Sequence, residues 1–192
     1  MPSSGTAVLA WTLMLAAPAP SAMAQSAERN STASKTRLAA SGPPAVVTRD
    51  SNGTTHVRST PLPEPMVLDG RLDETMYRTV PSIGGFIQQE PRAGEAATEQ
   101  TELWIFHDAK SLYFAARCWD SHPERDVVGD MRHDGEPITV MESLMMAFDT
   151  YHDRRNSFAF GVNSAGGLVD SYTTNERDNN RDWNTVWEGK VG

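Results

Sequence analysis

The stretch from residue 142 to residue 170 constrains the fold of this chain more than any other. It contains two apolar runs, Leu144–Phe148 and Ser157–Val162, separated by a charged, turn-forming loop. In the second run large apolar residues alternate with small ones, a period of two that is typical of a half-buried strand. Residues 163–167 are rich in Asn and Gly, which tolerate positive φ, so Leu168–Tyr172 should run back as another strand. We therefore expect an antiparallel β domain.

A second pair of strands is predicted earlier in the chain. Thr101–Phe106 and Leu112–Trp119 flank a short polar loop, and aromatic residues occur on both faces of the pair. This pattern indicates central strands that are covered on both sides, as in a β-sandwich. Shorter elements are predicted at Met66–Leu68 (strand), Glu74–Thr79 (helix) and Trp183–Val191 (last strand). Together these predict an all-β fold.

The first 24 residues have the pattern of a secretory signal peptide. Ala7–Pro20 is apolar, and Ala22-Met23-Ala24 is the small-x-small pattern that precedes a cleavage site, here before Gln25. The apolar run is too short to span a membrane. We therefore expect an exported protein that is periplasmic, associated with an outer membrane, or secreted.

The residues that follow this segment differ in composition from the rest of the chain. Residues 25–65 are mainly Ser, Thr, Ala, Pro and Gly, with few large apolar side chains to offset the entropy of ordering. We predict a disordered linker, with edge strands at most at Ala45–Val47 and His56–Arg58. The folded domain is then expected to span residues 66–192.

Charge and cysteine content exclude two classes of protein. The chain has a net charge of -8, and an acidic surface argues against binding of nucleic acid, whose phosphates need clustered Lys and Arg. Cys118 is the one cysteine, so no intrachain disulfide can form. Because Cys118 lies in an apolar strand pattern, we interpret it as a small buried residue.

Seven short motifs follow one another between residues 66 and 191. They are Leu68–Glu74, Gly85–Pro91 with Gly94, Thr98–Glu102, Asp108 with Leu112–Ala115, Asp149–Thr150 through Asp153–Asn156, Val162–Asn163 with Gly166, and Trp183 with Trp187. In this order they resemble the family 9 carbohydrate-binding modules, in the variant that precedes a C-terminal membrane-type barrel in exported bacterial proteins. The resemblance implies a jelly-roll-like pair of antiparallel sheets that binds sugars. It also implies that the C-terminal strands of the sandwich are missing from this chain.

A sugar-binding site needs flat aromatic faces for the C–H side of a pyranose and planar polar groups for its hydroxyls. The best local supply is the sequence Arg-Asp-Trp-Asn-Thr-Val-Trp at residues 181–187, and the long loop after Cys118 adds further candidates. The alternative for each tryptophan of residues 181–187 is a place in the sandwich core. The predicted carbohydrate-binding residues are Trp183, Trp187, Asn184, Trp119, Arg132 and Asp134.

A bound metal is considered from the same sequence. Asp149, Asp153 and the acidic run from Asp170 to Asp182 are rich in the oxygen ligands that calcium prefers, and family 9 modules can carry structural calcium. Asp149 and Asp153 are the candidate calcium ligands. The five histidines show no spacing typical of a zinc site. We expect no required cofactor, with structural calcium as the one metal candidate.

Catalytic motifs are not found. The sequence has no nucleophile elbow, phosphate-binding loop or Cys/His arrangement. We therefore expect an exported, monomeric, non-catalytic module that binds mono- or oligosaccharides. It would be ancillary to carbohydrate catabolism or to glycoside hydrolysis by an attached domain.

Two other functions stay open. One is an assembly or plug module for a C-terminal outer-membrane barrel, without sugar binding. The other is a haem-binding domain, because a related sandwich holds haem b between its sheets. The methionines that suggest haem are Met131, Met141, Met145 and Met146, although core packing is the better explanation for them.

Overall fold

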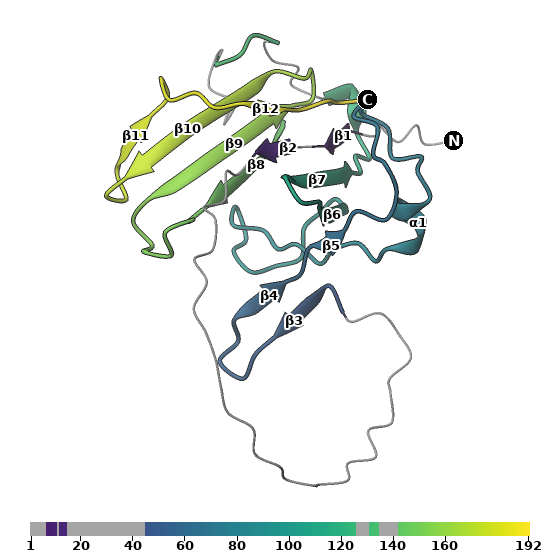
Figure 1. Cartoon of the computed structure of the whole chain (residues 1–192). Coiled ribbons are helices and arrows are strands. Elements are labelled where there is room, and N and C mark those ends of the chain that lie inside the picture. Colours follow the sequence, from purple (N-terminus) through teal and green to yellow (C-terminus); the bar gives the residue numbers. More distant parts are fainter. Residues whose placement is uncertain (1–6, 11, 15–44, 126–130, 135–141) are drawn as a thin grey trace, which may run out of the picture.

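The all-β prediction is confirmed. The computed structural model describes residues 7–10, 12–14, 45–125, 131–134 and 142–192. The described part consists of β-strands, a four-residue helix α1 (Met76–Thr79) and a 3-10 turn (Pro123–Arg125) (Figure 1). Almost all strand pairs are antiparallel. The sandwich and jelly-roll arrangement stays a prediction.

One sheet has four strands in the order β11-β10-β9-β8, each antiparallel to its neighbour. The strands are β8 (Ser143–Phe148), β9 (Ser157–Asn163), β10 (Leu168–Thr174) and β11 (Asp178–Asn180). β8 was predicted from its apolar run, β9 from the alternation of apolar residues and β10 from the turn before it, whereas β11 lies in a polar stretch. At the turn between β9 and β10, Gly166 adopts a φ of 86° and Asn163 accepts the amide of Gly167 at 2.7 Å.

The pairing register of this sheet decides which side chains share a face. Phe158 lies opposite Phe148 on one side and Tyr172 on the other, and Phe160 lies between Met146 and Asp170. Directly opposite residues point to the same side of a sheet. We call this side the inner face, because it packs against β6 and β7 of the second sheet.

The second sheet has the order β12-β2-β7-β6-β5, and β1 also pairs with β7. Its strands are β1 (Ala7–Ala10), β2 (Thr12–Met14), β5 (Thr60–Pro61), β6 (Thr101–His107), β7 (Ser111–Cys118) and β12 (Trp187–Glu188). β6 and β7 were predicted. The predicted strand Trp183–Val191 is wrong in extent, since only β12 pairs. Met66–Leu68 forms no strand, and β5 pairs with β6 in parallel instead.

The N-terminal part of the chain contributes strands in two places. β1 and β2 lie along one edge of β7, and β2 also pairs with β12. They come from the apolar segment that we predict to be a signal peptide. Within the predicted linker, β3 (Val47–Arg49) and β4 (Thr55–Val57) form a separate hairpin (Figure 1). Residues 25–44 lie outside the described residues.

Both faces of β6 are covered, as predicted for a central strand. Leu103 and Ile105 pack into the cluster on the inner face of the four-stranded sheet. Trp104 and Phe106 pack on the other side with Met76 of α1 and its neighbours. The Trp104 indole also donates a hydrogen bond to the carbonyl of Val80 at 2.9 Å, which satisfies its one polar atom in the core.

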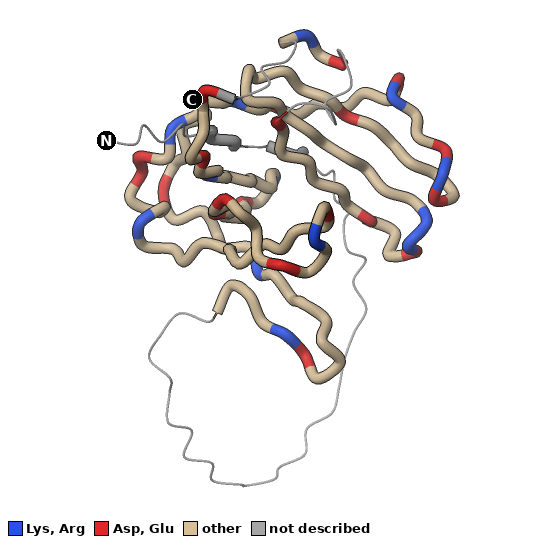
Figure 2. The backbone as a smooth tube through the Cα atoms, turned by 180° about the vertical axis from the view of Figure 1, so that it is seen from behind, with Lys and Arg blue, Asp and Glu red and all other residues tan. Residues whose placement is uncertain are grey.

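Charged residues are nearly absent from the middle of the four-stranded sheet. Figure 2 shows the acidic and basic residues of this sheet mainly at its turns. Within β8, β9 and β10 the only charged residue is Asp170, and it is fully buried. A buried carboxylate in an apolar face is costly unless it has partners, so Asp170 indicates a special site.

Candidate functional site

The inner face of the four-stranded sheet has two ends that differ in how far their side chains are exposed to solvent. At what we call the closed end, each side chain is at most 8% exposed; its members are Phe160 and Val162 of β9, with Phe114 of β7 and Trp187 of β12, which pack against them. At what we call the open end, the side chains are half-buried or exposed; its members are Phe158, Tyr172, Trp183 and Tyr151. Of these two ends, the open end is the one whose side chains are accessible to solvent.

The aromatic rings of the open end contact one another closely. Phe158 and Tyr172 stack with ring centroids 4.7 Å apart and an angle of 23° between their planes. The indole of Trp183 lies tilted beside both, 5.0 Å from Phe158 and 6.3 Å from Tyr172. Tyr151 is 62% exposed and extends the cluster, with its ring 6.3 Å from that of Phe158. The result is a continuous aromatic surface that is partly open to solvent.

Polar groups lie next to this surface. Asn180 lies opposite Tyr172 in the pairing register, on the same side of the sheet. Its side chain accepts the amide of Asp182 at 2.9 Å, and Asn184 donates to the carbonyl of Asp182 at 3.3 Å. These bonds order the turn that leads into Trp183. The exposed amides and carboxylates of this turn are suited to hydrogen bonds with sugar hydroxyls.

Trp187 lies in the core, at the closed end. Its indole Nε1 donates to Oδ2 of Asp170 at 3.1 Å, and the backbone amide of Thr185 donates to the same oxygen at 3.0 Å. Trp187 is therefore buried away from any ligand, whereas Trp183 is partly exposed. Asp170 fixes the segment that carries both tryptophans against β10, and in this way it sets the place of Trp183.

Two other predicted residues lie on a short segment beside Asp170. Asp134, with a φ of 54°, donates its backbone amide to the carbonyl of Leu168 at 3.0 Å. Its carboxylate Oδ2 lies 2.7 Å from Nδ1 of His133. Arg132 is exposed on the same segment. The structure thus brings Asp134 to Asp170, next to the segment of Trp183 and Asn184.

Trp119 lies away from these residues. The guanidinium of Arg117 is 5.9 Å from the rings of both Trp104 and Trp119. Trp104 packs with α1, on the side of β6 and β7 that faces away from the inner-face cluster. Trp119 is 36% exposed there, so it does not share a binding surface with Trp183.

The two candidate calcium ligands accept hydrogen bonds from their own loop. Asp149 accepts the backbone amides of Asp153 and Arg154 at 3.1 and 2.6 Å. Asp153 accepts the amides of Arg155 and Asn156 at 2.8 and 2.9 Å. These donors hold the pKa of Asp153 below its ordinary value. In this structure both carboxylates stabilise the loop between β8 and β9, and calcium binding stays a prediction.

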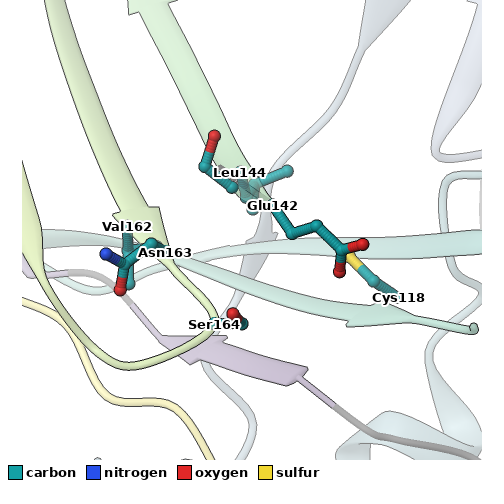
Figure 3. A pocket seen from close by; sticks show the side chains of 7 residues that line it. Cys118, Glu142, Leu144, Val162, Asn163 and Ser164 are labelled. Atoms are coloured by element: carbon teal, nitrogen blue, oxygen red, sulfur yellow. The ribbon is translucent and has the colours of Figure 1, made fainter. Parts of the chain in front are cut away.

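A cavity of about 250 Å³ lies beside the turn between β9 and β10, next to the start of β8 and the end of β7 (Figure 3). Cys118, Glu142 and Ser164 contribute side chains to its wall. Burial raises the pKa of the Cys118 thiol, against a hydrogen bond with Thr101 that lowers it. A thiol with a raised pKa is a poor nucleophile near neutral pH, in keeping with a packing role for Cys118.

The methionines that suggested haem do not converge. Met145 and Met146 are neighbours on β8, so their side chains point to opposite faces of the sheet. Met131 is 73% exposed, and Met141 lies outside the described residues. The haem hypothesis stays untested.

The predicted binding residues did not include Phe158, Tyr172 and Tyr151 of the open end, and Asp170 was considered only as part of an acidic run. The sequence did carry a signal for Asp170. It lies two residues from both Leu168 and Tyr172 in β10, so its side chain points to the same face of the sheet as theirs.

Among the described residues, no helix has the length and apolar character needed to cross a membrane. Comparison with protein-family models, with curated proteins and with solved structures gave no match for this chain.

Proposed function

We propose that this chain is an exported, non-catalytic module that binds a mono- or oligosaccharide at the open end of its four-stranded sheet. The observation that carries the proposal is the half-buried indole of Trp183, which extends the stacked pair of Phe158 and Tyr172 into a solvent-accessible aromatic surface. The resemblance to family 9 carbohydrate-binding modules supports it.

The chemistry of the open end suits a sugar. The C–H face of a pyranose packs on an aromatic ring, while its hydroxyls need planar donors and acceptors at the ring edge. Trp183 and Tyr151 supply ring faces, and the side chain of Asn184 is exposed beside Trp183. A surface this shallow leaves much of a ligand in water, so we expect dissociation constants of roughly 1 µM to 1 mM.

Isothermal titration of the whole chain against a panel of mono- and oligosaccharides tests the proposal. Trp183→Ala should weaken binding at least about tenfold, which corresponds to about 1.4 kcal/mol. Trp119→Ala is the matched control, because this tryptophan is also partly exposed but lies on the other side of β6 and β7. The Trp119→Ala variant should bind sugar with the same affinity as the wild type. Absence of heat for every sugar, with circular dichroism showing a folded protein, would contradict the proposal.

The same open end favours a second candidate, an assembly module for an attached barrel. A half-covered aromatic surface also suits the docking of another part of a longer protein. The two candidates differ in their ligand. Sugar-induced quenching of Trp183 fluorescence, lost in Trp183→Phe, supports the first, whereas failure of every sugar to bind leaves the second.

A further inference from the structure

We propose that His133, Asp134 and Asp170 form a binding site for a divalent transition-metal ion, with zinc as the best fit. One ligand atom from each of the three residues lies within 4.8 Å of the other two. The site is separate from the aromatic surface at the open end, and it does not depend on sugar binding.

The first argument is the unbalanced hydrogen bonding of Asp170. Its side chain is fully buried, and Oδ2 accepts both the amide of Thr185 and the indole of Trp187. Oδ1 has no hydrogen-bond partner among the described residues. Nor does any Lys or Arg of the described part form an ion pair with this carboxylate. Burying a carboxylate with one oxygen unpaired is costly, and a bound cation would offset that cost.

The second argument is that two further metal-binding side chains lie beside the Asp170 carboxylate. The imidazole of His133 and the carboxylate of Asp134 belong to a segment that is tied to β10 by the bond from the Asp134 amide to Leu168. Their side chains are 43% and 29% exposed, so an ion can enter from solvent on this side and meet the buried carboxylate behind. A metal site needs ligands that solvent can reach, here His133 and Asp134, and a buried negative charge, here Asp170.

The donor set selects the metal. Calcium and magnesium prefer oxygen ligands alone, whereas an imidazole nitrogen with two carboxylates suits zinc and similar ions. Zinc bonds to these atoms are about 2.0–2.2 Å long, which places ligands of a tetrahedral ion about 3.4 Å apart. The three ligand atoms lie within 4.8 Å of one another, and the partly exposed side chains of His133 and Asp134 can adjust to this spacing. Three protein ligands leave one position for water.

Metal binding to the whole chain tests the site. After treatment with a chelator, the protein is titrated with Zn²⁺ and, in parallel, with Co²⁺, whose visible absorption reports tetrahedral nitrogen and oxygen ligands. We expect about one Zn²⁺ bound per chain, and a rise in the melting temperature on adding metal, because the ion binds only the folded chain. His133→Ala should weaken binding at least about tenfold and abolish the cobalt band.

His122→Ala is the matched control. His122 is an exposed histidine whose Nδ1 lies 3.2 Å from a carboxylate oxygen of Glu124, yet in the described part of the chain it belongs to no three-ligand group. Its loss should leave zinc binding unchanged. Asp170→Asn should weaken binding as His133→Ala does; if this variant does not fold, the surface variant His133→Ala decides. Equal zinc affinity of the wild type and His133→Ala, or no zinc bound by the folded wild type, would overturn the proposal.

Discussion

The closed end and the open end of the inner face share strand β9, yet they have different surroundings. Phe158 and Phe160 are two residues apart on β9 and point the same way, but only Phe160 is fully covered. The difference comes from what lies opposite. Phe160 meets Trp187, with ring centroids 5.5 Å apart, whereas Phe158 meets Trp183 at the border with solvent. The segment that carries Trp183 and Trp187 therefore contributes to the burial of this face, together with β6 and β7 of the second sheet.

The largest expected effect breaks the closed end. Trp187→Ala removes a buried indole and the hydrogen bond to Asp170, and should lower the free energy of unfolding by about 3–5 kcal/mol. Urea unfolding followed by circular dichroism measures this. Trp119→Ala, at a partly exposed site, should cost about 1 kcal/mol or less. A loss below about 1 kcal/mol for Trp187→Ala would show that the segment is not packed as described.

A smaller effect is expected from the carboxylate that holds this segment. Asp170→Ala leaves the amide of Thr185 and the indole of Trp187 without their acceptor, which should cost about 2–3 kcal/mol in metal-free protein. Asp170→Asn keeps an acceptor oxygen and should recover part of the loss. Denaturant unfolding of both variants in the presence of a chelator provides the comparison; equal stability of the two would mean that the hydrogen bonds contribute little.

At the open end, stability and binding should respond differently. Because Trp183 is only half-buried, Trp183→Ala should cost about 1–2 kcal/mol of stability, less than half the cost of Trp187→Ala. Under the proposed function, Trp183→Ala should also weaken sugar binding, because its ring is part of the proposed binding surface. The side chain of Trp187 lies in the core and would not contact the sugar. Thermal unfolding and titration of the same samples separate the two roles. A Trp183 variant as unstable as the Trp187 variant would place both tryptophans in one core.

The smallest expected effect concerns pH and the loop between β8 and β9. The pKa of Asp153 is lowered by the amides that it accepts, so its carboxylate stabilises the folded state at pH values above the ordinary pKa of about 3.9. This contribution is lost as the pH falls through the lowered pKa. Between pH 5 and pH 2 the wild type should lose more stability than Asp153→Asn, whose side chain does not titrate. Parallel pH profiles of the two proteins would contradict this.

Much of the fold was predictable because strand alternation is a local property. The apolar residues of β9, two positions apart, indicate both the strand and the face that is buried. The extent of the last strand was not predictable. Trp183 and Trp187 have the even spacing of strand residues, but the chain between them is held by Asp170, a residue that only the folded sheet brings near.

The candidate site shows the same limit. Trp183 and Asn184 were predicted from a local supply of aromatic and polar residues, and the structure places them at one surface. The partners Phe158 and Tyr172 reach that surface through pairing between strands, which local composition does not reveal. His133 showed no metal spacing along the chain for the same reason, since its nearest buried carboxylate belongs to β10.

The pairing of β1 and β2 with β7 has a consequence for the maturation of the protein. These strands occupy backbone donors and acceptors along one edge of β7 and reach β12. Cleavage before Gln25 would remove both strands and leave that edge unpaired, as a template for an incoming strand. With the predicted cleavage, this edge of β7 would be paired before the cut and free to accept another strand after it.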